Sequence, residues 1–224
     1  VANIDYQTAV LLAIHCGAVA VSRYDDKNVC YDSVNLLTKC AKDGASCLRQ
    51  VNIHHMISEE TYDQCIETLN DKLTDPRLRE LNAIVLLSLK QKGRGINHTP
   101  LGFDKFKNLV NFALNNIIGI GFDSCTAPKF LEAVRDHKQY QAFKTVSEPC
   151  ESGLFSIYIN VNGNFFPCSF SEDEGEWKEG ISVVNCKDFL QDIWFHDRVK
   201  TWRNNLMTNI HNNHGCRECP LFKV

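Results

Sequence analysis

The sequence contains no apolar run of about 20 residues, which is the length that a membrane-spanning helix needs. Its start has neither a basic segment nor an apolar stretch behind it, so no secretory signal is visible and we expect a cytoplasmic protein. Neither sign of charge dominates, since the net charge is −3, and we therefore expect neither nucleic acid nor a membrane as a partner. The first residue is not methionine, which leads us to expect a fragment or a trimmed form of a longer protein.

The remaining composition is that of an ordinary globular protein. Hydrophobic residues make up 44% of the 224 positions and charged residues 23%, which is a usual balance for a folded domain. At roughly 100–200 residues per domain, this length predicts one domain or two small ones. A chain of this size buries a real core without needing disulfides or metal ions for stability.

Cysteine is the residue type in clear excess, with eleven in the chain. An odd number without a secretory signal argues against a disulfide framework, which leaves buried thiols and metal ligands as the two uses. The first six cysteines stand isolated among apolar or helical residues, and we expect them to be small core side chains. They are Cys16, Cys30, Cys40, Cys47, Cys65 and Cys125.

Helical and strand patterns alternate from residue 1 to about residue 136. Helices are expected at 6–15, 29–42, 58–73 (with Ser58 as N-cap), 103–115 and 127–136, and strands at 18–22, 50–57, 82–89 and 117–122. Such alternation predicts βαβ units, and therefore a parallel sheet with helices outside it. The units are too few for a closed eight-stranded barrel. The sequence thus predicts an α/β domain at 1–140, either half a barrel or a small open sheet.

A different pattern begins near residue 145. Residues 155–161 alternate with a period of two, Asn162-Gly163 is a strong hairpin signal, and residues 164–168 read as the returning strand. An acidic loop follows at 171–180, and an amphipathic helix is expected at 189–207. We therefore expect a second, smaller domain at 145–224.

Four of the later cysteines can meet at one centre. Cys150 precedes the predicted hairpin and Cys168 ends it, so the turn returns the second cysteine to the first. The last helix leads to Cys216-x-x-Cys219, a turn that aims two thiolates at one point. Four thiolates suit either Zn²⁺ or an iron–sulfur cluster, and spacing alone leaves both open, together with four unrelated thiols. The stretch 211–214 holds two further histidines near the pair, although four cysteines leave no vacancy.

The segment from Cys150 onward resembles the twitch domain, the short form of the SPASM domain that follows radical S-adenosylmethionine (SAM) barrels. That family has a cysteine, 9–15 residues, and Gly-x4-Cys; here twelve residues separate Cys150 from Gly163, and four separate Gly163 from Cys168. The closing Cys-Arg-Glu-Cys-Pro also matches, and the layout is similar to that of the 2-deoxy-scyllo-inosamine dehydrogenases. The resemblance implies that Cys150, Cys168, Cys216 and Cys219 ligate one auxiliary [4Fe–4S] cluster.

The N-terminal part resembles the later half of a radical SAM barrel, with segments 18–24, 50–58 and 82–95 as its fourth, fifth and sixth strands. Ligand sites of α/β folds form at strand ends. The resemblance implies SAM contacts for Ser22, Arg23 and His54, and Cys125 is a candidate catalytic hydrogen donor or substrate contact. The alternative interpretations are a surface serine, a solvated arginine, a core histidine and a structural thiol.

One departure limits what the resemblance implies. No two cysteines are four apart, so the Cys-x3-Cys-x2-Cys motif that holds the SAM-cleaving cluster is missing, and the barrel's first three strands have no counterpart. We expect SAM to bind only together with a missing N-terminal half, and we expect no SAM cleavage by this chain alone.

Three functions therefore compete. The chain is the C-terminal part of a radical SAM oxidoreductase or peptide-modifying maturase, a degenerate relative that acts as a binding module, or a structural zinc protein with four cysteine ligands. In the first of these, the auxiliary cluster accepts an electron from the substrate. The expected partners are the missing half-barrel or a reductant protein, with a small-molecule or peptide substrate.

Overall fold

Contacts divide the computed structural model into two compact units, and the structure describes residues 3–211 and 216–222. The sheet unit comprises Val1–Leu89 and His98–Asp123, and the cysteine unit comprises Lys90–Asn97 and Ser124–Val224. The chain therefore passes from one unit to the other three times, because the short segment at 90–97 belongs with the C-terminal part. The limits expected from the sequence, 1–140 and 145–224, stay a prediction.

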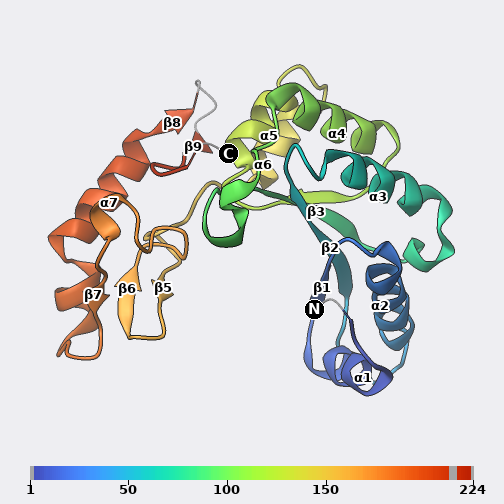
Figure 1. Ribbon diagram of the computed structural model, residues 1–224, viewed down its shortest axis with the longest axis horizontal. Helices are drawn as coiled ribbons and strands as arrows, with labels where there is room; N and C mark the ends of the chain where they lie inside the picture. Colours follow the sequence, from blue (N-terminus) through green and yellow to red (C-terminus); the bar gives the residue numbers. More distant parts are fainter. Residues whose placement is uncertain (1–2, 212–215, 223–224) are drawn as a thin grey trace. The chain divides into compact units, whose positions relative to one another are not determined.

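Four parallel strands in the order β1-β2-β3-β4 form the sheet of the first unit. Figure 1 shows β1, β2 and β3 of this sheet. The strands are β1 (Ala18–Ser22), β2 (Gln50–Ile57), β3 (Ala83–Ser88) and β4 (Ile120–Phe122), and the helices are α1 (Tyr6–His15), α2 (Lys27–Cys40), α3 (Tyr62–Thr74), the short η1 (Pro76–Leu78) and α4 (Phe103–Asn115). All three strand pairs are parallel, with helices in the crossovers between consecutive strands. The predicted α/β class and parallel sheet are confirmed, and the arrangement is consistent with part of a barrel.

The two faces of this sheet differ in burial. Val21 of β1 and Ile53 of β2 are paired in register and fully buried, and α2 and α3 pack on these strands. Residues on the opposite face, such as Ala20 and Asn52, are only half-buried. Because side chains alternate along a strand, every second residue of these strands lies on the half-buried face. The strand ends, where polar side chains were predicted to bind SAM, follow the same alternation.

Two helix starts differ from the sequence prediction because of local hydrogen bonds. α2 begins two residues early, since the Asp26 carboxylate accepts a hydrogen bond of 2.9 Å from the Asn28 N–H. The prediction that Ser58 caps the next helix is wrong, because α3 begins at Tyr62 behind Thr61. Ser58 and Thr61 instead exchange hydrogen bonds, from the Ser58 N–H to Thr61 Oγ1 (2.9 Å) and from the Thr61 N–H to Ser58 Oγ (3.2 Å). Both hydroxyls are thereby used in a turn that precedes the helix.

The cysteine unit consists of short elements. Its strands are β5 (Tyr158–Ile159), β6 (Asn164–Phe166) and β7 (Ile181–Ser182) in one sheet and β8 (Ile210–His211) and β9 (Cys216–Arg217) in another, and its helices are η2 (Gly93–Asn97), α5 (Ala127–Ala133), α6 (Tyr140–Val146), η3 (Gly175–Trp177), the π-helical η4 (Phe189–Trp194) and α7 (Asp197–Thr208). The predicted hairpin is confirmed as the antiparallel pair β5 and β6. The prediction of one helix over 189–207 is wrong, because the extended backbone of His196 ends η4 and its ring accepts from the Arg198 N–H to start α7.

An aromatic core fixes the hairpin within this unit. Phe165 and Phe166 of β6 pack with Trp177 and with residues of η4 and α7 in one buried cluster. The Trp177 ring lies 6.1 Å from that of Phe165 and 6.2 Å from that of Trp202, the latter edge-on, between ring centroids. At the turn, Gly163 has a positive φ of 71°, and an added Cβ would lie 2.4 Å from Val184 Cγ2. Both the turn and the returning strand are therefore tightly constrained.

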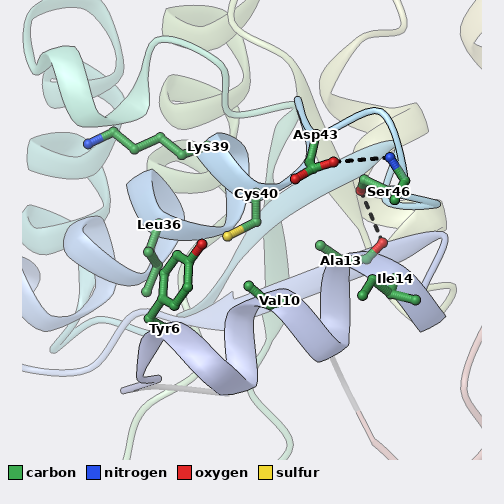
Figure 2. A pocket seen from close by; sticks show the side chains of 10 residues that line it. Tyr6, Val10, Ala13, Ile14, Leu36, Lys39, Cys40, Asp43 and Ser46 are labelled. Carbon is green, nitrogen blue, oxygen red and sulfur yellow. Dashed lines mark hydrogen bonds between the residues drawn. The ribbon is translucent and has the colours of Figure 1, made fainter.

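An apolar pocket of about 230 Å³ lies between α1 and α2 of the sheet unit. Figure 2 shows the side chains that line it. Tyr6 and Val10 of α1 face Leu36 and Cys40 of α2 across the pocket. Ser46 also lines it, and its hydroxyl donates a hydrogen bond of 3.0 Å to the Ala13 carbonyl. None of the described residues that line this pocket is a predicted site residue. In addition, none of the helices within 3–211 and 216–222 has the length and apolarity to cross a membrane.

We predict that Phe165→Ala lowers the free energy of unfolding of the cysteine unit by about 3–5 kcal/mol, because it empties the centre of a buried aromatic cluster. Denaturant unfolding followed by tryptophan fluorescence measures this change, since all three tryptophans lie in this unit. Val161→Ala, at a fully exposed position of the same hairpin, should change stability by less than about 0.5 kcal/mol. Equal stability of the two variants would contradict the assignment of the core.

Candidate metal centre

Hydrogen bonds to backbone carbonyls bring the segment after Cys150 to the residue before Cys168. The Ser152 hydroxyl donates to the Pro167 carbonyl at 3.0 Å, and the Gly153 N–H donates to the same carbonyl at 3.1 Å. The indole of Trp202 donates to the Ser152 carbonyl at 3.3 Å, which attaches this junction to α7. The predicted return of Cys168 to the neighbourhood of Cys150 is thus present in the fold.

The backbone of Cys168 is held by a buried serine. The Ser171 hydroxyl donates to the Cys168 carbonyl at 2.6 Å and accepts from the Cys168 N–H at 3.3 Å. Because Ser171 is fully buried, solvent does not compete for these bonds. Cys168 therefore stands on a fixed turn with its side chain half-buried.

Backbone N–H groups point at the cysteine sulfurs. The Phe222 N–H donates to Cys219 Sγ at 3.3 Å. The N–H groups of Leu221, Arg217 and Ser152 lower the pKa of the Cys219, Cys216 and Cys150 thiols, respectively. Each of these bonds favours the thiolate form of the sulfur, which is the form that binds metals. Amide donors of this kind surround metal-bound thiolates, so the donor set fits a cysteine-ligated centre.

Electrostatic interactions between thiols show which sulfurs are neighbours. A hydrogen bond from Cys125 holds the pKa of Cys150 below its usual value, while burial and the nearby Cys219 and Cys168 act in the opposite direction. Burial raises the pKa of Cys219, and Cys125 and Cys168 raise it further. The thiols of Cys125, Cys150, Cys168 and Cys219 therefore influence one another within the cysteine unit.

Cys216 has a different environment at the start of β9. Burial raises the pKa of its thiol, and the adjacent Arg217 opposes that shift through its N–H group and its charge. The Arg217 side chain donates to Met207 Sδ at 3.3 Å, and its buried Nε has no hydrogen-bond partner in the described part of the chain. A positive charge thus lies beside one of the predicted ligands. Over residues 3–211 and 216–222, no three His, Cys, Asp or Glu side chains form a site for a single metal ion.

Comparison with protein families identifies the segment that contains these sulfurs. Residues 150–220 match the SPASM family model, which is described as an iron-sulfur cluster-binding domain. This segment is therefore similar to domains that bind an iron–sulfur cluster. The matched SPASM segment runs from Cys150 to the residue after Cys219 and so includes all four predicted ligands. Comparisons with curated proteins and with solved structures find no match, so the likeness to 2-deoxy-scyllo-inosamine dehydrogenases has no support.

The three predicted SAM contacts do not all share one face of the sheet. Ser22 of β1 and His54 of β2 are directly paired in register, and both are half-buried. Arg23 lies on the opposite, helix-covered face, where its Nη2 is 3.3 Å from the Glu67 carboxylate on α3. In the residues that the structure describes, its buried Nε and Nη1 have no hydrogen-bond partner. The fold thus brings Ser22 and His54 together and separates Arg23 from them, and SAM binding by these residues stays a prediction.

Of the two histidines next to the cysteine pair, the structure describes only His211. His211 of β8 has its Nδ1 in contact with the Glu218 carboxylate, and its Nε2 lies 3.9 Å from Glu132 Oε2. Both ring nitrogens therefore face carboxylates. His214, the other histidine of this stretch, lies outside the described residues.

The six isolated cysteines do not behave alike. Cys30 and Cys65 are fully buried, as predicted, and burial raises the pKa of their thiols to about 11 and about 12. The prediction is wrong for Cys47, which is exposed, and Cys16 and Cys40 are half-buried. Cys125 is also half-buried, and its bond to Cys150 is a contact that isolation in the sequence did not indicate.

Sequence reasoning also missed Ser171 and Arg217, which support the site without being ligands. Neither residue is part of the cysteine spacing pattern. A serine in an acidic loop also looks like an ordinary residue of a solvated turn.

We predict that Arg217→Gln shifts the reduction potential of the cluster-loaded protein to a more negative value. The substitution removes a positive charge beside Cys216, and a lost positive charge disfavours the more negative, reduced state. A redox titration followed by electron paramagnetic resonance measures the shift. Lys200→Gln removes the same charge from an exposed position of α7 and should leave the potential nearly unchanged. A shift of equal size in both variants would contradict a local effect of Arg217.

Proposed function

We propose that this chain uses Cys150, Cys168, Cys216 and Cys219 to hold one auxiliary [4Fe–4S] cluster that accepts an electron during a radical SAM reaction. The observation that carries the proposal is the SPASM match over 150–220. It is supported by the Phe222 N–H that donates to Cys219 Sγ and by the N–H groups that lower the pKa of the Cys150 and Cys216 thiols. The cluster-free chain would keep its thiols reduced in the cytoplasm, where we place the protein.

The surrounding residues are suited to electron transfer rather than to substrate binding at iron. When four cysteines ligate such a cluster, it exchanges electrons while no iron is left open to a substrate. Cys150 and Cys216 are buried, which limits access of water to the sulfurs. Arg217 and the amide donors offset part of the negative charge that four thiolates and an added electron bring together.

The sheet unit supplies the link to SAM in this proposal. β1 is at one end of the strand order and pairs only with β2 in the described structure, so its other edge is available to a further parallel strand. A half-barrel that adds strands there would place SAM near Ser22 and His54, which are at the carboxyl ends of β1 and β2. The SAM-cleaving cluster would be held by that other half.

An electron acceptor near a substrate radical fits a net oxidation of the substrate. We therefore propose an oxidoreductase or a peptide-modifying maturase, with a small-molecule or peptide substrate and a redox protein that removes the accepted electron. A binding module without redox activity and a structural zinc protein are the alternatives, and the next two experiments distinguish them.

Anaerobic reconstitution should give a brown protein with about four iron and four sulfide per chain. Cys168→Ala should lose most of this iron, because the substitution removes a thiolate at the end of the hairpin. Cys186→Ala is the matched control, since Cys186 is a half-buried thiol of the same unit that belongs to no predicted ligand set. A colourless protein with one zinc per chain would support the structural zinc alternative and overturn the cluster.

The reconstituted and reduced chain should produce no 5′-deoxyadenosine from SAM, because it has no Cys-x3-Cys-x2-Cys motif. Liquid chromatography with mass detection measures the product, and an active radical SAM enzyme in the same buffer is the positive control. Product formation by this chain alone would show that its own cluster cleaves SAM. If the cluster cannot be reduced at any accessible potential, the binding-module alternative is supported.

A further inference from the structure

Two aromatic rings join the turn that contains Cys168 to the turn that contains Cys219. Phe170 follows Cys168 by two residues, and Phe222 follows Cys219 by three. The two ring centroids are 6.3 Å apart and the rings are inclined at 74°, an edge-on arrangement that aromatic pairs favour. The contact therefore connects two predicted ligands that are far apart in the sequence.

The backbone of Phe222 also contacts one of these sulfurs directly. Its N–H donates a hydrogen bond of 3.3 Å to Cys219 Sγ. Between the two residues, Pro220 has a fixed φ and the Leu221 side chain packs against the aromatic core of the unit. The direction of this donor therefore depends on a short turn whose far end is held by the Phe222 ring on Phe170.

Phe170 is held in place by several neighbours. Lys92 Nζ donates to the Phe170 carbonyl at 3.4 Å, and Lys90 Nζ lies 5.1 Å from the centre of the Phe170 ring. The next residue, Ser171, is fully buried and hydrogen-bonds to both backbone groups of Cys168. Phe170 thus offers a fixed surface to the Phe222 ring. Its side chain is 39% exposed, so it can be substituted without emptying the core.

A donor to a ligand sulfur affects how readily a cluster takes up an electron. The added electron increases the negative charge on the cluster and its sulfurs, and a backbone N–H that points at a sulfur stabilises this reduced state. Such a donor therefore raises the reduction potential. Its effect depends on direction, because a hydrogen bond weakens steeply as its angle departs from linearity. A side chain that fixes the direction of the N–H thus changes the potential without touching the cluster.

Resting on the proposed function, we infer that Phe222 is a positioning residue whose ring, packed on Phe170, directs its own N–H at Cys219 Sγ and so raises the reduction potential of the auxiliary cluster. Phe222 lies beyond the segment matched by the SPASM family, which ends at residue 220. A residue outside the family match therefore contributes to the property that suits the cluster to accept an electron.

Redox titration of the reconstituted protein, with iron content measured in parallel, tests this inference. Phe222→Pro deletes the N–H itself and should give the most negative potential of the variants. Phe222→Leu keeps the N–H but loses the edge-on ring contact, so its potential should shift in the same direction by a smaller amount. Phe222→Tyr keeps both the N–H and the ring and should have the potential of the unchanged protein.

A second set of variants tests the ring contact. Phe170→Leu should shift the potential as Phe222→Leu does. The double variant Phe170→Leu/Phe222→Leu should shift it no further than either single variant, because both substitutions remove the same contact. Phe195→Leu is the matched control, since Phe195 is a 44% exposed phenylalanine of the same unit, and its potential should be unchanged.

The outcomes separate this inference from the proposed function. Unchanged potentials in Phe222→Pro and in both leucine variants, with about four iron retained, would overturn the inference while the cluster itself would stand. An equal shift in Phe195→Leu would also overturn it, because the effect would not be local. If Phe222→Pro loses iron, the leucine variants decide, since they keep every N–H: a shift supports the inference and its absence overturns it. If the unchanged protein binds no iron, the proposed function fails first, and this inference fails with it.

Discussion

The closure of one hairpin is the constraint on which the candidate centre depends. Two donors, the hydroxyl of Ser152 and the N–H of Gly153, share the Pro167 carbonyl and so join the residues next to Cys150 and Cys168. Seventeen residues lie between these cysteines, and without this closure the loss of chain entropy on bringing them together would oppose binding. This entropy is lost when the hairpin folds and not when a metal binds, because the aromatic core and the turn at Gly163 already fix the hairpin.

The surroundings of the sulfurs combine burial with compensation of charge. Burial alone disfavours thiolates, as the raised pKa values of Cys216 and Cys219 indicate. Amide donors and the charge of Arg217 act in the opposite direction at the same atoms. A site with both features holds negative charge in a poorly solvated place, which is the condition under which small changes in hydrogen bonding alter a redox potential.

Local patterns predicted the regular elements well and the tertiary contacts poorly. The bounds of β1, β2 and α1 agree with the sequence prediction, because short apolar runs and glycine or proline boundaries carry that information locally. The break at His196 was not predicted, since the amphipathic pattern runs through it and only the backbone of that residue departs from a helix. The set of four cysteine ligands stays a prediction, and the interaction of Cys125 with Cys150 was not predicted. It depends on how α5 packs in three dimensions, and no sequence interval encodes that.

The segment Lys90–Asn97 has a consequence for how this molecule can be divided. Lys92 Nζ lies 3.4 Å from the Glu174 carboxylate, and the Lys90 ammonium is 5.1 Å from the centre of the Phe170 ring, so this loop between β3 and α4 belongs with residues that follow it by about eighty positions. A recombinant piece cut at the family boundary would therefore lose a strand-to-helix loop that it needs. Transplanting the cluster-binding part onto another scaffold requires a discontinuous graft, and evolution by simple domain exchange would meet the same obstacle.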